Sequence, residues 1–224
     1  MEPRLVLFDC DGTLVDSAAI IVAAMKAAFV AHTLAPPSDA EVRAIIGLSL
    51  PRAVATLAAR HPEAPVDALV TAYKDSYRDT ATQDAEHEPT FPGTHETLDL
   101  LRAEPATILG VVTGKSRRGL NRVLAAHGLS GHFSVTMTAD DAPSKPSPVM
   151  VQHALSATGI DAPRTVVIGD TSYDMEMARA AGAAAIGVAW GYHAEASLEE
   201  AGAQAIARAM SDLPMLIKAL VPDV

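Results

Sequence analysis

The chain has 224 residues, of which 49% are hydrophobic, so it is long enough for one large globular domain or for a domain with a sizeable insertion. Its formal net charge of -10 argues against nucleic acid or an anionic membrane surface as a partner, because both select basic patches. The single cysteine, Cys10, excludes an internal disulfide, and no stretch approaches the roughly 20 apolar residues of a membrane span. We therefore expect a cytoplasmic protein.

The first predicted element is a strand at residues 4–8 (RLVLF), which leads directly into two acids, Asp9 and Asp11. The strand is continuously apolar rather than alternating, which is typical of a strand covered on both faces of a sheet. Like charges repel and burial of a carboxylate is costly, so the pair of acids needs a chemical explanation.

The next segment, residues 16–90, contains only helical patterns. In the first of them Ile21, Met25 and Phe29 recur every four residues, as one face of a helix requires. We predict an inserted helical cap at residues 16–90, connected near residues 15–17 and 89–93 to a core formed by residues 1–15 and 91–224. The predicted cap helices are Ser17–His32, Asp39–Ile46, Leu50–His61 and Val66–Asp84.

From residue 94 onward, helical and strand patterns alternate. This repetition predicts an α/β fold, a Rossmann-like parallel sheet with right-handed crossovers and helices on both faces. The predicted helices are 94–104, 116–127, 147–158 and 172–181. The predicted strands are 106–112, 134–138, 165–169 and 184–189.

Chemically unusual residues follow the predicted strands, at the edge where ligands bind in open parallel sheets. Acids follow the first and fourth strands, a threonine follows the second, and a lysine lies in the proline-stiffened loop DDAPSKPSP after the third. We expect these side chains to meet at one edge of the sheet. They are Asp9, Asp11, Thr113, Lys145, Asp170 and Asp174.

Crowded carboxylates raise one another's pKa, and a hard divalent cation removes this penalty. Mg²⁺ suits one or two direct carboxylates combined with waters and a phosphate oxygen, and it would keep Asp9 ionised as a nucleophile. Asp11 could then protonate a leaving group and later act as a base. Lys145 and the Thr113 hydroxyl could stabilise phosphoryl oxygens, and Gly114 would let a backbone N–H approach them.

Four segments, DCDGTLVDS, VVTGKS, KPSP and GDTSYDM, resemble in order and spacing the four motifs of the haloacid dehalogenase-like superfamily. The helical insertion and FPG at residues 91–93 resemble the cap of its phosphoglycolate phosphatase-like branch. The resemblance implies hydrolysis of a small phosphomonoester through a phospho-Asp9 intermediate. It implies Mg²⁺ held by the Asp9 carboxylate, the Asp11 carbonyl and Asp170. Asp174 is implied to support the metal shell.

Two further residues are candidates for contact with the substrate. Cys10 lies between the two acids of the first motif, and we expect it beside the phosphate, with its thiol packed rather than reactive. Arg52, in the predicted cap, is the candidate for meeting an anionic leaving group.

Departures from the phosphoglycolate phosphatase pattern leave the substrate open. Gly114 stands where many of those enzymes have Asn, so phosphoglycolate is one candidate substrate among others. The acid at position 11 argues against dehalogenation and phosphonate cleavage. Ile21 stands where mutases resembling β-phosphoglucomutase carry a His, which disfavours a mutase. A sugar-phosphate mutase and a pyrophosphatase of the same superfamily remain alternatives, and the oligomeric state is open.

Overall fold

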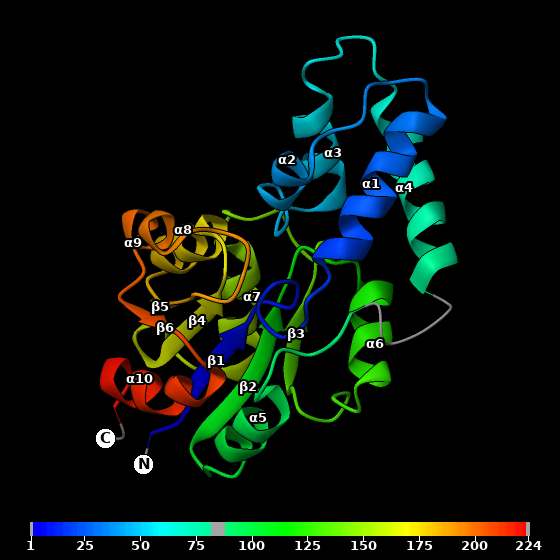
Figure 1. Cartoon of the computed structure of the whole chain (residues 1–224). Coiled ribbons are helices and arrows are strands. Elements are labelled where there is room, and N and C mark those ends of the chain that lie inside the picture. The colour runs from blue at the N-terminus through cyan, green and yellow to red at the C-terminus, as the bar shows by residue number, and fades with distance from the viewer. Residues whose placement is uncertain (1, 82–87, 223–224) are drawn as a thin grey trace.

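The computed structural model describes residues 2–81 and 88–222 and has an α/β core with a helical unit above one edge of its sheet (Figure 1). Within the described residues, six parallel strands form one sheet in the order β3-β2-β1-β4-β5-β6. The predicted parallel-sheet fold is therefore confirmed. The strands are β1 Arg4–Phe8, β2 Thr107–Val112, β3 Val135–Met137, β4 Thr165–Gly169, β5 Ala184–Val188 and β6 Ala205–Ala207.

Helices cover both faces of the sheet, as the continuous apolar strands predict. Val6 and Phe8 of β1 pack in one buried cluster and Leu5 and Leu7 pack in another, because successive side chains of a strand point to opposite faces. The first cluster is covered by α5 Thr94–Arg102, α6 Arg117–Ala126 and α10 Leu213–Leu220. The second is covered by α7 Val149–Thr158, α8 Ser172–Ala181 and α9 Glu195–Ala201.

Strand β1 lies at the centre of the sheet and is completely buried. Its last residue, Phe8, is in register with Val111 of β2 and Ile168 of β4. The three strands consequently end at the same level, so that the residues following them are brought to one edge.

The four helices within residues 18–81, which we call the helical unit, enclose a buried core of their own. Met25 and Phe29 of its first helix pack with Val54 and Leu69 of later ones. All four predicted helices are present, although the second and third end earlier than predicted, at Arg43 and Ala58. The predicted end at Asp84 lies outside the described residues. The helices are α1 Ala18–Ala31, α2 Asp39–Arg43, α3 Leu50–Ala58 and α4 Val66–Ala81.

The two connections between the helical unit and the core lie side by side. Val15 and Thr90 form an antiparallel bridge, and the Asp16 amide donates to the Pro89 carbonyl oxygen at 2.8 Å. Paired connections of this kind can act together as a hinge. The domain boundaries at 15/16 and 90/91 stay a prediction.

Three elements near the C-terminus have no counterpart in the predictions, namely β6, α9 and α10. The β6 strand has only three residues, and α9 buries a single side chain, Leu198, so neither gives a periodic apolar pattern. None of the helices in the described part of the chain combines the length and apolar character needed to cross a membrane.

Candidate active site

Four of the predicted site residues meet in one buried cluster beyond the ends of β1 and β4. Asp9, Asp170 and Asp174 are each fully buried and bring carboxylate oxygens within 4.8 Å of one another. Lys145 lies between two of them, with its Nζ 2.9 Å from Asp9 Oδ1 and 2.6 Å from Asp174 Oδ1. The lysine reaches this position from the loop that precedes α7.

Asp9 has an unusual electrostatic environment. Neither of its carboxylate oxygens has a well-aligned hydrogen-bond donor among the described residues, although Lys145 is close enough for an ion pair. Burial raises the pKa of Asp9; the Lys145 charge lowers it and the Asp174 charge raises it again, leaving it at about 7. A buried carboxylate without hydrogen bonds is costly, so this side chain is suited to a ligand that supplies positive charge.

The two other acids are held by the protein. Asp170 accepts hydrogen bonds from the Thr13 hydroxyl at 3.1 Å and the Tyr192 amide at 2.9 Å. Asp174 uses Oδ2 to accept from the amide and hydroxyl of Thr171, which caps α8, and uses Oδ1 to accept from Lys145. Asp174 therefore serves as a helix-capping residue and also holds the lysine, and its part in a metal shell stays a prediction.

The cluster fits a magnesium ion. When all three carboxylates are ionised, they exceed the charge of the one ammonium by two negative charges in a fully buried site. The donors are all oxygens, which Mg²⁺ prefers. Burial raises the pKa of Asp170 well above its usual range, and the charges of Asp174 and Asp9 raise it further, so a divalent cation would stabilise the ionised form.

Thr113 follows β2 and is fully buried, as expected for a residue that would contact a phosphoryl group. Its hydroxyl oxygen accepts a hydrogen bond from the Lys115 amide at 3.2 Å, and its own amide donates to the Met137 carbonyl. These two hydrogen bonds fix the backbone of residues 113–115 at the end of β2.

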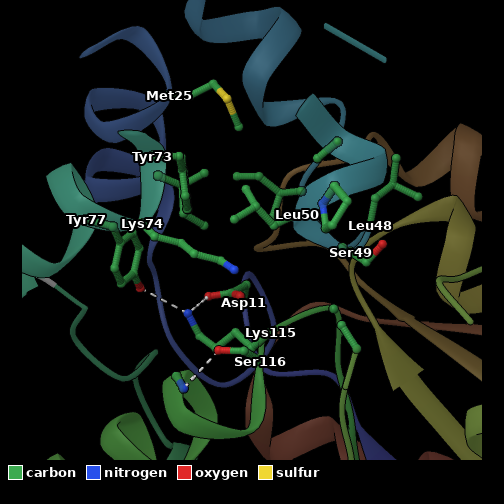
Figure 2. A pocket seen from close by; sticks show the side chains of 18 of the residues that line it. Asp11, Met25, Leu48, Ser49, Leu50, Tyr73, Lys74, Tyr77, Lys115 and Ser116 are labelled. Atoms are coloured by element: carbon green, nitrogen blue, oxygen red, sulfur yellow. Dashed lines mark hydrogen bonds and ion pairs between the residues drawn. The ribbon is translucent and has the colours of Figure 1, made fainter. Parts of the chain in front are cut away.

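The Asp11 side chain belongs to a second group of charges. Its Oδ1 lies 2.7 Å from Lys115 Nζ and accepts a short hydrogen bond from the Ser17 hydroxyl. Lys115 Nζ also lies 3.1 Å from both Glu88 Oε1 and Tyr77 Oη, and Figure 2 shows it between Asp11 and Tyr77. The structure therefore brings together Asp9, Lys145, Asp170 and Asp174, while the Asp11 carboxylate faces Lys115.

Sequence reasoning did not single out Lys115, Glu88 and Tyr77. The position of Lys115 directly after the threonine and glycine of the second motif was the available signal. Glu88 is buried, and burial raises its pKa, but Lys115 and hydrogen bonds from Tyr77 and Arg122 lower it to about 2. Tyr77 comes from the helical unit and Lys115 from the core, so the group connects the two parts.

A cavity of about 600 Å³ lies between the helical unit and the core. The core contributes Asp11 and Lys115, which Figure 2 shows below the side chains of the helical unit. Arg52, the predicted contact for a leaving group, does not line it; its Nη1 instead donates to the Lys145 carbonyl oxygen at 3.3 Å. Cys10 is fully buried in the core, so its thiol is not open to a substrate in this structure.

Comparisons with known proteins agree with this geometry. The sequence profile of the haloacid dehalogenase-like hydrolases matches residues 6–188, which span most of the chain. The chain belongs to this family. It is 38% identical over 215 residues to "Probable phosphatase IndB" of Dickeya dadantii, covering 95% of this chain and 92% of the relative.

Two further relatives cover nearly the whole chain. The "Phosphoglycolate phosphatase" of Chromobacterium violaceum is 32% identical over 219 residues, covering 96% of both chains. The crystal structure of a hydrolase from Pseudomonas syringae superposes with a TM-score of 0.84 at 27% identity, covering 97% of this chain and 99% of the other. The phosphoglycolate phosphatase-like branch predicted from the motifs is thereby confirmed.

Within this family member, Gly114 is required by close packing. A Cβ atom at this position would lie 2.6 Å from the carbonyl oxygens of Gly47 and Leu48, which belong to the helical unit. These are backbone atoms that cannot rotate away, so the Asn found in many phosphoglycolate phosphatases would not fit here. The helical unit rests directly on the second motif.

Gly114→Ala should therefore push the helical unit away from the core. We expect a loss of roughly tenfold in kcat/KM, since overpacking by one methyl group costs about 1–3 kcal/mol. Gly131→Ala is the matched control, because a Cβ there meets no atom within 4 Å. Wild-type activity in Gly114→Ala would show that this contact is absent from the active conformation. Steady-state kinetics on one phosphate ester would measure both variants.

Proposed function

We propose that this chain is a magnesium-dependent phosphatase that hydrolyses a small phosphomonoester through an aspartyl phosphate on Asp9. The observation that carries the proposal is the Asp9 carboxylate, buried beside Lys145 with no aligned hydrogen-bond donor among the described residues. Such a carboxylate is available for bond formation to phosphorus. Family membership and relatives named as phosphatases support the same activity.

Each residue of the cluster has a proposed role. Asp9 attacks phosphorus, and the leaving group takes a proton from Asp11, which later removes a proton from the attacking water. Lys145 and Thr113 stabilise the phosphoryl oxygens as charge develops. Mg²⁺, when bound by Asp9, the Asp11 carbonyl and Asp170, supplies the positive charge that keeps Asp9 ionised.

We further propose that the helical unit acts as a cap that closes over the site. Its separate core and its paired connections to the sheet would let it move as one body. Asp9 is fully buried in this structure, so substrate would enter while the helical unit is displaced. Closure would exclude water from the phosphorylated enzyme. Arg52, which contacts the Lys145 carbonyl, would then hold the closed state in addition to any contact with substrate.

The lining of the cavity disfavours a mutase. Ile21 occupies the place of the mutase histidine, and its apolar side chain lines the cavity. A mutase would need a group there that can donate and accept protons. A pyrophosphatase would place a second phosphate in the cavity, which is also lined by Lys and Arg side chains, so it stays the second candidate function.

The direct test of the activity is release of inorganic phosphate from para-nitrophenyl phosphate. We expect turnover with Mg²⁺ and loss of turnover when the ion is removed with EDTA, with recovery on adding Mg²⁺ back. Absence of phosphate release under all three conditions would contradict the proposed function.

Replacement of Asp11 separates the acid role from the nucleophile role. Asp11→Asn should still bind Mg²⁺, because the proposed ligand at this position is the backbone carbonyl. Single-turnover release of an activated phenol should slow by less than about tenfold, whereas release of an unactivated alcohol should slow by about 10²–10⁴. Equal slowing of both esters in a rapid-quench experiment would contradict the acid role.

A further inference from the structure

The proposed phosphate-binding cluster does not indicate which leaving group the substrate carries. The residues that line the cavity do. The helical unit supplies apolar side chains on three sides, and Figure 2 shows Met25, Leu48, Leu50 and Tyr73 around the open space. Met25 and Leu48 are nearly inaccessible to solvent, so these walls belong to a formed pocket. A pocket of this size and lining suits an organic group with an apolar body rather than a short acid such as glycolate.

Cationic residues are concentrated at the same cavity. Five Lys and Arg side chains line it against two acids, although the chain as a whole has 17 Lys and Arg against 27 Asp and Glu. The cations are Lys74, Arg78, Lys115, Arg118 and Arg122, and the acids are Asp11 and Asp140. An excess of positive charge in an acidic protein indicates a ligand with negative charge.

Most of these cations are already neutralised. Lys115 pairs with Asp11 and Glu88, and Arg122 pairs with Glu88. Arg78 pairs with Asp75, one turn earlier in the same helix.

Lys74 differs from these residues. Its ammonium has no ion-pair or hydrogen-bond partner within the part of the chain that the structure describes. Figure 2 shows the side chain extending from α4 into the cavity, with its nitrogen directed toward the space above Asp11. Arg118, at the start of α6, is a second cavity cation without a partner among the described residues.

We propose that the substrate is a phosphomonoester whose leaving group has a ring-sized apolar body and an anionic group, and that Lys74 binds this anionic group. The inference rests on the proposed phosphatase function and adds the class of leaving group. The apolar body lies against the side chains of the helical unit, and the ester oxygen lies near Asp11. Lys74 is thereby the specificity-determining residue that sequence reasoning had sought at Arg52.

The test compares four alkyl phosphates with similar leaving-group chemistry. Ethyl phosphate has neither feature, phosphoglycolate has only the anion, benzyl phosphate has only the apolar ring, and para-carboxybenzyl phosphate has both. We expect para-carboxybenzyl phosphate to have the highest kcat/KM, about tenfold above benzyl phosphate because a charge-assisted hydrogen bond is gained. It should exceed phosphoglycolate by about a hundredfold because of the buried ring.

Lys74→Met keeps the apolar stem of the side chain and removes the charge. The ratio of kcat/KM for para-carboxybenzyl to benzyl phosphate should fall from about tenfold to near unity. Lys26→Met is the matched control, because Lys26 is on the same helical unit but pairs with Asp39 and does not line the cavity. This control should leave the ratio unchanged.

Three outcomes would overturn the inference. If phosphoglycolate is turned over as efficiently as para-carboxybenzyl phosphate, the apolar body is not recognised. If Lys74→Met leaves the ratio unchanged, Lys74 does not bind the anion. If none of the four esters, nor para-nitrophenyl phosphate, releases phosphate with Mg²⁺, the proposed function itself fails, and the assigned leaving group fails with it.

Discussion

Asp9→Asn should lower kcat by at least about a thousandfold, which corresponds to about 4 kcal/mol of activation free energy. The amide retains the size and shape of the carboxylate but cannot attack phosphorus. The oxygens of Asp9 have no aligned hydrogen-bond donor among the described residues. The substitution removes the Asp9–Lys145 ion pair, but Lys145 keeps its pair with Asp174, so we expect the variant to fold. Steady-state release of phosphate from an activated ester would measure the loss.

A control measurement must show that the Asp9→Asn variant still folds. Far-ultraviolet circular dichroism and the midpoint of urea unfolding should stay near the wild-type values. Turnover within about tenfold of wild type would exclude Asp9 as the nucleophile, since a missing covalent route costs far more.

Lys145→Met should destabilise the protein by about 3–5 kcal/mol in the absence of Mg²⁺, because it leaves buried carboxylates without their counter-charge. Burial alone would lower the pKa of Lys145, but Asp174 and Asp9 raise it above its ordinary value, so the lysine is charged in the wild type. In the variant, the pKa of Asp9 would rise further, because the Lys145 charge that lowers it is gone. The destabilisation should therefore be smallest at low pH, where Asp9 can take up a proton, and should increase as the pH rises.

Urea unfolding of Lys145→Met in EDTA, at several pH values, would measure this effect. Lys26→Met is a suitable control, since it removes an exposed lysine that pairs with Asp39 and should cost no more than about 1 kcal/mol. A Lys145→Met variant as stable as Lys26→Met at high pH would show that the buried carboxylates do not depend on the lysine.

The fold was largely predictable because its strands are continuously apolar and alternate with helical patterns. The first strand, Arg4–Phe8, and the fourth, Thr165–Gly169, were predicted to the residue. Elements near the C-terminus were not, because β6 is too short and α9 buries too few side chains to give a pattern.

The candidate site also has one part that was predictable from the sequence and one part that was not. The cluster of Asp9, Lys145, Asp170 and Asp174 follows from strand ends that a parallel sheet must bring together. The contacts between the helical unit and the core do not follow from any local pattern, since they depend on how two separate bodies dock. The contact of Lys115 with Tyr77 and the partner of Arg52 could therefore be found only in the structure.

Gly114 is another residue whose role depends on the contact between the helical unit and the core. Its departure from the usual Asn was visible in the sequence, but its cause was not. The cause is the backbone of Gly47 and Leu48, which belongs to the helical unit and lies against it.

The most direct test of the central claim is to look for the phosphoryl group on the protein. Asp11→Asn should form the aspartyl phosphate from an activated aryl phosphate but hydrolyse it slowly. Acid quenching during turnover, followed by mass spectrometry of the peptide that contains residues 5–26, should show one added phosphoryl group on Asp9. No such adduct should form in the Asp9→Asn variant. Release of the phenol without any adduct, or an adduct on another residue, would contradict the account.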